Sequence, residues 1–358
     1  MKLQFKHQKF QADAAKAVVD VFAGQPYLTP TYMMDKGTVI KKQKVKGVDI
    51  SDPYESKIYD TAADFTGWRN ERIVPELSDK LILEHLQKVQ RTNQLKPSDK
   101  LEGRYNLTIE METGVGKTYT YIKTMYELNK HYGWSKFIVV VPSVAIREGV
   151  YKSFQVTQDH FAEEYGKKIR FFIYSSKNLT EIDRFASDSA INVMIINTQA
   201  FAASMNEDKN VEGRKGDAAA RIIYTKRDEF GSRRPIDVIA ANRPILILDE
   251  PQKMGKEDSA TQKALKKFNP LFTLNYSATH AKQHNLIYVL DALDAYNKRL
   301  VKKIEVKGFE VKNLRGTDKY LYLESIIISP KNPPRAKVEL EVSHQTVSYT
   351  HLRAHETG

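Results

Sequence analysis

From Tyr105 onward the chain alternates short apolar runs with segments of helical periodicity, and this alternation limits the fold more than any other feature. Runs such as FIVVV at 137–141 and ILIL at 245–248 are apolar on both faces, as expected for parallel strands covered by helices on each side. The expected strands are Asn106–Met111, Phe137–Val141, Ile169–Tyr174, Asn192–Ile196, Pro244–Leu248 and Leu271–Asn275. The predicted fold class is therefore α/β, with a parallel sheet flanked by helices.

The regions around this core are less regular. Apolar side chains at helical intervals predict a helix over Phe10–Phe22, and a second helix is expected near Leu77–Gln90. Residues 27–70 are expected to be irregular, and the charged, Gly-rich segment 203–243 to be a surface insertion. After about Val301 strand-like alternation (KIEVKGFEV, LYLESIIIS), punctuated by Pro330, Pro333 and Pro334, predicts a β-rich segment.

These patterns suggest four regions. Residues 1–100 form an N-terminal helix and insertion, 101–300 the α/β domain, and 301–341 the start of the β-rich segment. The ending VSYTHLRAHETG does not continue the preceding pattern, so we expect residues 342–358 to be a non-native tail. His344, His351 and His355 lie in this tail without a scaffold or matched spacing, so we expect no metal site there.

Composition excludes some chemistry and leaves other options open. The 358 residues include no cysteine, which rules out disulfides, thiolate metal sites and cysteine nucleophiles. The net charge of +12 favours a polyanionic partner such as nucleic acid, but it is equally compatible with a well-solvated surface. No apolar run reaches the length of a signal peptide or a membrane span, so a cytoplasmic location and no membrane partner are expected.

One segment has the composition of a phosphate-binding loop. IEMETGVGKTYTYI reads as strand, loop and helix, and it matches the P-loop pattern except that Met111 stands where the first Gly is usual. Gly114 and Gly116 would let backbone N–H groups surround phosphate oxygens. Lys117 would neutralise the β- and γ-phosphates of ATP, and Thr118 would offer its hydroxyl to Mg²⁺. The predicted cofactor-binding residues are Glu112, Thr113, Gly114, Val115, Gly116, Lys117 and Thr118. The alternative is a Gly-rich turn that binds nothing.

A second segment supplies the acids that a phosphate loop requires. PILILDEPQ is an apolar strand that ends in Asp249 and Glu250, where α/β sheets bind ligands. Asp249 would hold Mg²⁺, and Glu250 would orient or deprotonate the attacking water. Glu250, Lys117 and Gln252 are the candidate catalytic residues. The alternative is an ordinary strand end with solvated acids.

With these motifs in place, the sequence resembles a superfamily 2 helicase of the DEAD/DEAH-like kind. DEPQ and Ser277-Ala278-Thr279 correspond to motifs II and III. Longer stretches, among them IEMETGVGKTYTYIKTMYELNKHYGWSKFIVVVPSVAIREGVYKSF, TQDHF, RPILILDEPQKMG and NYSATH, resemble the Res subunit of type III restriction–modification enzymes. The resemblance implies a RecA-like first motor domain that uses Mg-ATP to move along or switch on double-stranded DNA. A methyltransferase (modification) subunit would be its partner. We find neither the later helicase motifs nor a nuclease motif.

The resemblance also assigns roles to residues outside the two loops. It implies that Gln11 contacts adenine, although an exposed helical Gln is usually just solvated. It implies that Ser277 and Thr279 couple nucleotide state to nucleic-acid binding, although such hydroxyls often bond nearby backbone. The implied nucleic-acid contacts are Pro142, Ser143, Arg147, Asn197 and Thr198, with Gln199 beside them. Either group, the residues within 142–147 or those within 197–199, could instead be a plain strand-end turn.

The sequence thus leaves two classes of function. The first is an ATP-hydrolysing motor of a type III restriction endonuclease, slow in this chain alone. The alternative is a nucleotide-binding regulatory or RNA-binding module without motor activity.

Overall fold

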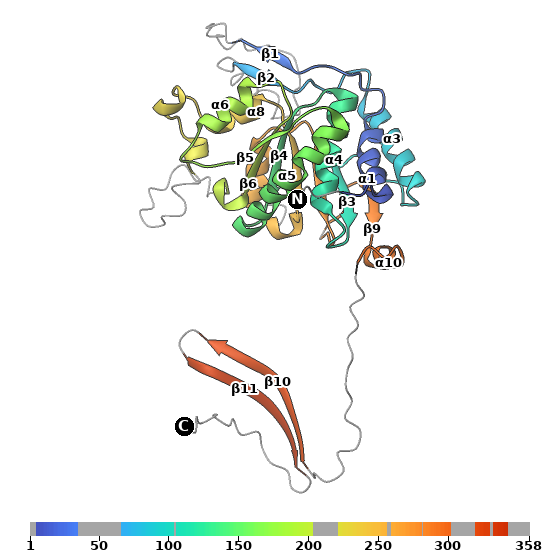
Figure 1. Cartoon of the computed structure of the whole chain (residues 1–358), viewed down its shortest axis with the longest axis vertical. Coiled ribbons are helices and arrows are strands. Elements are labelled where there is room, and N and C mark those ends of the chain that lie inside the picture. Colours follow the sequence, from blue (N-terminus) through green and yellow to red (C-terminus); the bar gives the residue numbers. More distant parts are fainter. Residues whose placement is uncertain are drawn as a thin grey trace. The chain divides into compact units, whose positions relative to one another are not determined.

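A parallel sheet forms the centre of the larger of two units, Met1–Lys302 and Lys303–Gly358, in the computed structural model of the chain (Figure 1). The structure describes residues 5–34, 66–103, 105–202, 221–255, 259–280, 282–301, 319–329 and 332–342. Among these residues the sheet has 7 strands in the order β5-β6-β4-β7-β8-β3-β9. Every neighbouring pair in it is parallel. The strands are β3 (Asn106–Met111), β4 (Lys136–Val141), β5 (Arg170–Ile173), β6 (Asn192–Asn197), β7 (Ile245–Asp249), β8 (Thr273–Ser277) and β9 (Leu286–Leu290).

Helices cover both faces of this sheet, as the fully apolar strands predicted. Along β4, Phe137, Val139 and Val141 enter one core cluster, whereas Ile138 and Val140 enter the other. The first cluster is shared with α1 (Lys9–Val21), α3 (Asp79–Thr92), α4 (Lys117–Tyr132) and α5 (Val144–Tyr165). The second is shared with α6 (Thr180–Ser187), α8 (Pro235–Ala241) and α9 (Ala260–Lys267). Figure 1 shows α1, α3, α4 and α5 together on the near side of the sheet.

The six predicted strands are all present, which confirms the α/β class, but a seventh was missed. Strand β9 is five residues long, like β7 and β8, so its length does not explain why it was missed. It pairs with β3 at an edge of the sheet and is followed by α10 (Ala292–Asn297). The strand that precedes the phosphate loop therefore has neighbours on both sides.

The described parts of the segment before the core are more regular than predicted. Of residues 27–70, the described parts include β1 (Thr31–Met33) and β2 (Gly67–Arg69), which pair antiparallel. The fully buried Asn70 then joins β2 to the sheet. Its amide donates to the carbonyls of Lys136 and Arg243 at 3.0 and 2.9 Å, and its oxygen accepts from the N–H groups of Ser135 and Lys136. All its hydrogen-bonding groups are used, so this irregular-looking region is tied to the start of β4.

The prediction of a surface insertion over 203–243 is wrong for its second half. Residues 221–243 contain the 3₁₀ turns η3 (Ile222–Tyr224) and η4 (Asp228–Phe230) and the helix α8. Ile223, Phe230 and Ile239 are buried in the second core cluster. The apolar residues of this segment are dispersed among charged ones, so no apolar run or periodicity marked them as core residues. Residues 203–220 lie outside the described part of the chain.

The smaller unit contains a long hairpin of β10 (Lys319–Ser329) and β11 (Asn332–Val342). The first matches the strand-like LYLESIIIS, whereas KIEVKGFEV falls outside the described residues, as does Pro330. Pro333 and Pro334, which punctuate the predicted β-rich segment, lie within β11 near its start. Proline is tolerated at the beginning of an edge strand, where its missing N–H costs no ladder bond. The tail beyond Val342, with its three histidines, also lies outside the described residues.

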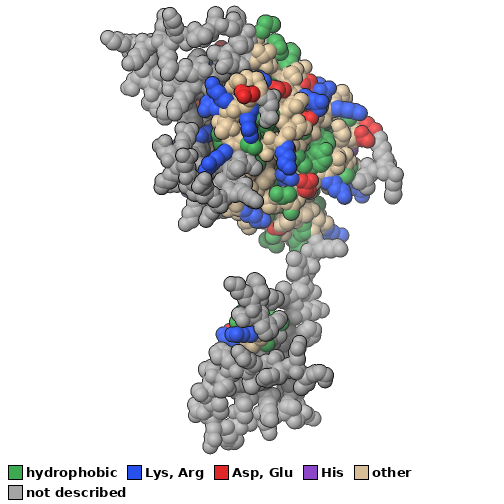
Figure 2. Space-filling model, turned by 90° about the vertical axis from the view of Figure 1, so that its left-hand side faces the viewer, with side chains coloured by type: hydrophobic (Ala, Val, Ile, Leu, Met, Phe, Trp, Pro, Cys, Tyr) green, Lys and Arg blue, Asp and Glu red, His purple; other side chains and the backbone are tan. Residues whose placement is uncertain are grey.

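The surface in Figure 2 shows how positive charge is distributed on one face. Lys and Arg side chains are scattered there among acidic ones and do not gather into a single track. In the described residues no helix is both long and apolar enough to cross a bilayer.

Lys136, at the start of β4, is completely buried, which is unusual for a lysine. Its ammonium donates to the carbonyls of Phe185 and Asp188. Burial lowers the pKa of Lys136 to about 7, although the nearby Asp188 carboxylate opposes the shift. In the unfolded chain Lys136 stays protonated until the pH reaches its ordinary pKa, whereas folding disfavours the charged amine.

The consequence is a stability that rises with pH. Between about pH 7 and pH 10.5 the unfolded chain binds more protons at Lys136 than the folded chain does, so the free energy of unfolding increases across this window. We predict that Lys136→Met flattens this rise, as measured by urea unfolding at both ends of the window. Lys88→Met, at an exposed position of α3, should leave the rise unchanged. An equal slope in Lys136→Met and the parent would contradict the prediction.

Candidate nucleotide site

The glycine-rich loop connects β3 to α4 and has the backbone that the sequence predicted. Gly114 and Gly116 have φ of +83° and +90°, in the left-handed region that favours glycine. Gly116 is the N-cap of α4, so Lys117 begins the helix. Met111, which departs from the usual motif, is fully buried at the end of β3 and lies outside the turn itself. The departure therefore leaves the loop unaffected.

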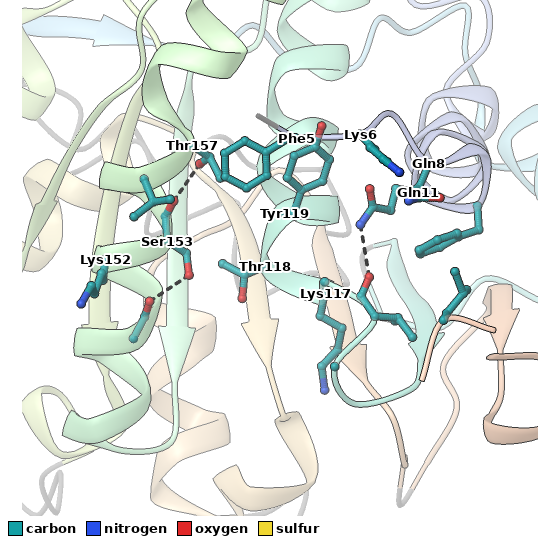
Figure 3. Close-up of a pocket in the computed structure, with 17 residues that line it drawn as sticks. Phe5, Lys6, Gln8, Gln11, Lys117, Thr118, Tyr119, Lys152, Ser153 and Thr157 are labelled. Atoms are coloured by element: carbon teal, nitrogen blue, oxygen red, sulfur yellow. Dashed lines mark hydrogen bonds between the residues drawn. The ribbon is translucent and has the colours of Figure 1, made fainter. Parts of the chain in front are cut away.

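A cavity of about 740 Å³ opens beside this loop. Its walls come from the phosphate loop, the segment before α1, and α5 (Figure 3). In Figure 3 the rings of Phe5 and Tyr119 lie together at one end, and Lys117 extends toward the other. The lining residues are Phe5, Lys6, Gln8, Phe10, Gln11, Gly114, Val115, Gly116, Lys117, Thr118, Tyr119, Gly149, Lys152, Ser153, Val156, Thr157 and Leu300. Of the predicted loop residues, Glu112 and Thr113 stand outside this lining.

Gln11 lies in the cavity wall, so it is not a solvated surface residue. Its side chain is buried, and its amide donates to the backbone carbonyl of Val115 at 3.2 Å. A Cβ placed on Gly116 would come within 2.8 Å of the same amide nitrogen. The N-terminal helix is thus in direct contact with the phosphate loop.

Lys117 and Glu250 meet across the end of the sheet. Their side chains form an ion pair, and only 11% and 17% of the two side chains is exposed. They come from the loops that follow β3 and β7, whose carboxyl ends share one edge of the parallel sheet. Glu250 itself adopts a left-handed backbone, with φ of +58°. The structure therefore brings together the lysine and the acid that the two motifs predicted.

Glu250 is also held by two further predicted residues. The Ser277 hydroxyl lies 2.9 Å from its Oε2, and the Gln252 amide donates to the same oxygen at 2.6 Å. Burial raises the pKa of Glu250, but Lys117 and these two donors outweigh it and hold the pKa below its ordinary value. Thr279 completes the group, because its N–H donates to the Ser277 hydroxyl at 3.2 Å.

Asp249 occupies a different environment from its neighbour. It is 5% exposed, and burial raises its pKa to about 6, with Lys117 opposing the shift and Glu250 adding to it. The Tyr121 hydroxyl donates to its Oδ2 at 3.4 Å. Burial and Asp249 raise the pKa of Tyr121, while a hydrogen bond with Thr118 opposes them. Tyr121 therefore connects the two predicted metal ligands, Thr118 and Asp249.

Two residues of this site were not predicted. Tyr121 was not singled out in the sequence, although its position one turn after Lys117 and Thr118 was a usable signal. His280 follows motif III, and its ring lies 3.3 Å from the carbonyl of Ile109. Burial lowers the pKa of His280, and the charges of Glu250 and Lys117 both act on it.

The predicted nucleic-acid contacts gather at the ends of β4 and β6. The carbonyl of Pro142 accepts from the side chains of Thr198 and Gln199, both at 3.2 Å. Arg147 donates to Asn197 at 3.0 Å, and Ser143 caps α5 by accepting from the N–H of Ile146. Asn197 and Thr198 are buried, so these two side chains stabilise the turns. Of these residues Pro142, Ser143 and Arg147 keep partly exposed surface, and Gln199 is exposed.

Comparison with known proteins now decides the family. The family described as "Type III restriction enzyme, res subunit" matches residues 77–282, more than half of the chain. The chain belongs to this Res family. The match spans β3, β7 and β8, and hence the phosphate loop, the acid pair and Ser277.

Individual relatives agree with this assignment. The Res subunit of the type III enzyme EcoPI, from Escherichia phage P1, is 31% identical over 245 residues, which are 64% of this chain and 24% of that protein. The StyLTI Res subunit of Salmonella typhimurium strain LT2 is 26% identical over 258 residues, covering 62% of this chain and 24% of that protein. This Res-family chain thus spans about a quarter of the length of the relatives it matches.

Two solved structures are also similar. The Sulfolobus solfataricus SWI2/SNF2 ATPase core in complex with double-stranded DNA gives a TM-score of 0.32 at 11% identity, covering 55% of this chain and 31% of that one. A nuclease-deletion mutant of the type ISP restriction–modification enzyme LlaGI, with a DNA substrate mimic, gives 0.33 at 12% identity, covering 61% and 20%.

The contact between Gly116 and Gln11 predicts how the loop responds to a side chain. Gly116→Ala and Gly114→Ala both introduce left-handed strain of about 1–2 kcal/mol, but a Cβ at 114 meets nothing within 4 Å. We therefore expect Gly116→Ala to lower the free energy of unfolding by more than Gly114→Ala. Gln11→Ala should remove the excess in a double-mutant cycle. An excess that persists without the Gln11 side chain would show that this contact is not its cause.

Proposed function

We propose that this cavity binds Mg-ATP and that the chain hydrolyses it, as the motor portion of a type III restriction enzyme that acts on double-stranded DNA. The observation that supports this most strongly is the contact between Lys117 and Glu250 beside the glycine-rich loop. Family membership supports the restriction enzyme as the setting. The chain spans about a quarter of its relatives, so DNA and a modification subunit enter as part of the proposal.

The loop is suited to a triphosphate. The N–H groups at the start of the 16-residue helix α4 have no partners within the helix and favour an anion. Gly114 and Gly116 leave room for phosphate oxygens where a Cβ would stand. Lys117 then exchanges Glu250 for the β- and γ-phosphates. The cavity extends from there to Gln11, whose amide suits the polar edge of an adenine ring.

The residues present also fit a magnesium ion. Thr118 and Asp249 offer a hydroxyl and a carboxylate, the oxygen ligands that Mg²⁺ prefers, and Tyr121 contacts both side chains. A bound Mg²⁺ would neutralise charge on the phosphates during transfer. Asp249 needs to be ionised for this role, and with a pKa of about 6 it is largely a carboxylate at neutral pH.

Glu250 is suited to activating water once Lys117 has left it for the phosphates. The donors Ser277 and Gln252 still hold its carboxylate. The carboxylate accepts a proton as the water oxygen forms a bond to the γ-phosphorus and the bond to the ADP oxygen breaks. The buried Oε1 of Gln252 has no partner among the described residues, so it is free to accept a second hydrogen bond from that water.

The same hydrogen bonds offer a route to DNA. Ser277 and Thr279 contact Glu250 and Gln252, so a change at the acid pair reaches the loop after β8. Arg147 and the N-terminus of α5 lie at the ends of β4 and β6. Their partly exposed surface would contact the phosphate backbone of DNA. Such contacts are independent of base sequence and weaken with salt.

The first test separates binding from hydrolysis. Glu250→Gln should keep ATP affinity but lower turnover by about 10²–10⁴-fold, the usual contribution of a general base. Lys117→Ala should lose binding as well, because it removes the charge opposite the phosphates. Glu84→Gln, an exposed position on α3, is the matched control. The measurements are fluorescent-nucleotide binding and phosphate release. Undiminished turnover in Glu250→Gln would reject its assigned role.

The second test addresses the motor. An arginine supplied by a second motor domain can accelerate phosphoryl transfer by ~10³–10⁵-fold, and the sequence has no recognisable motif for one. We therefore expect slow ATP hydrolysis from this chain and no DNA cleavage. Turnover should be compared without nucleic acid, with duplex DNA and with single-stranded RNA, each at two salt concentrations. Fast DNA-stimulated hydrolysis would contradict the prediction, and stimulation by RNA alone would favour the RNA-binding alternative.

A further inference from the structure

We propose that His7, His160 and Glu164 form a binding site for a divalent transition-metal ion such as Zn²⁺, beside the nucleotide cavity and separate from the magnesium ligands. Each of the three offers one donor atom, and these atoms all lie within 4.8 Å of one another. Two imidazole nitrogens and a carboxylate oxygen are a donor set that binds Zn²⁺ with a fourth position left for water. This inference does not depend on the proposed function.

The three donors come from two elements that the fold holds together. His160 and Glu164 are one turn apart on α5 and share a face of the helix. His7 belongs to the segment that leads into α1. Glu164 Oε2 is 3.8 Å from His160 Nε2 and 3.9 Å from His7 Nδ1. Donors bound tetrahedrally at zinc distances stand roughly 3.4 Å apart, so the two Glu164 pairs would each close by roughly half an ångström, and the two histidine nitrogens, which lie within 4.8 Å of each other, would also approach.

The carboxylate of Glu164 is already oriented for this role. Lys123 binds its Oε1 at 2.5 Å, and the same ammonium donates to the Tyr165 hydroxyl at 3.0 Å. Oε2 is left facing the two histidines. Metal-binding carboxylates are commonly fixed by such outer hydrogen bonds. The Lys123 charge lowers the affinity of the site for a cation, but its bond to Oε1 also orients the carboxylate whose Oε2 the ion needs.

Two adjustments would accompany binding. The Tyr119 hydroxyl lies 2.7 Å from His160 Nε2, and it would give up this hydrogen bond to the ion. The side chain of His7 is 66% exposed, so it can move toward α5 at little cost. Neither adjustment disturbs the core.

The ion would act on the wall of the nucleotide cavity. The Phe5 ring lies 5.2 Å from that of His160 and 5.8 Å from that of Tyr119, between centroids. Phe5, Lys6 and Gln8 line the cavity, and Figure 3 shows Phe5 against Tyr119. His7 stands between them in the chain. A metal ion shared by His7 and α5 would therefore fasten this segment across the end of the cavity.

The test measures Zn²⁺ binding to the whole chain by calorimetry, with Co²⁺ absorption as a spectroscopic probe. His344, His351 and His355 are replaced by Ala in every protein, so that ions bound by the tail are not counted. His7→Ala removes one donor from an exposed position, and His160→Phe removes another while keeping an aromatic ring among Phe5, Tyr119 and Phe161. His131→Ala is the control, because His131 and Glu127 form a similar pair on α4, 3.4 Å apart, that is not part of the three-donor cluster found among the described residues.

We expect one Zn²⁺ per chain, affinity at least about tenfold lower in His7→Ala and His160→Phe, and no change in His131→Ala. Hydrogen exchange at residues 5–8 should slow when Zn²⁺ is added to the parent and not when it is added to His7→Ala. Absence of stoichiometric binding, equal affinity in His7→Ala, or loss of binding in His131→Ala would overturn the proposal. Unfolding curves of the apo proteins check that each variant is folded.

Discussion

The contact between Lys117 and Glu250 is the constraint on which the site depends. Both charges are removed from most of the solvent, and an unpaired charge in such a position would be costly. Each therefore stabilises the other, and the pair links the loop after β3 to the loop after β7. Under the proposed function a phosphate group competes with Glu250 for the same ammonium. The phosphate that binds Lys117 then frees the Glu250 carboxylate in the same step, and no separate conformational change is needed.

Much of the fold could be predicted because the central strands are buried on both faces. A strand such as β4 has no polar residue after Lys136, as expected for a parallel strand covered on both faces. The predictions that failed concern segments without such continuous apolar runs. Segment 221–243 buries Ile223, Phe230 and Ile239 among many charges, so composition hid its packing. The segment before the core is joined to the central sheet by Asn70, whose long-range hydrogen bonds leave no periodic trace in the sequence.

The site was predictable to the extent that its chemistry is local in sequence. The phosphate loop, the acid pair and Ser277 stand in short motifs, and the structure brings Lys117, Glu250 and Ser277 into contact. Tyr121 and His280 were missed because their importance arises only when separate strand ends meet. The side chains of Asn197 and Thr198 are buried in the turns that they stabilise, and their contact with nucleic acid stays a prediction.

The order of the strands has a consequence for motif III. Strand β8 lies between β3 and β7, so the phosphate loop and the acid loop are two strand spacings apart, roughly 10 Å. Ser277 ends this intervening strand, and its short side chain lies 2.9 Å from the Glu250 carboxylate that pairs with Lys117. We therefore expect a larger side chain at 277 to displace Glu250 from Lys117, even if it preserved every charge.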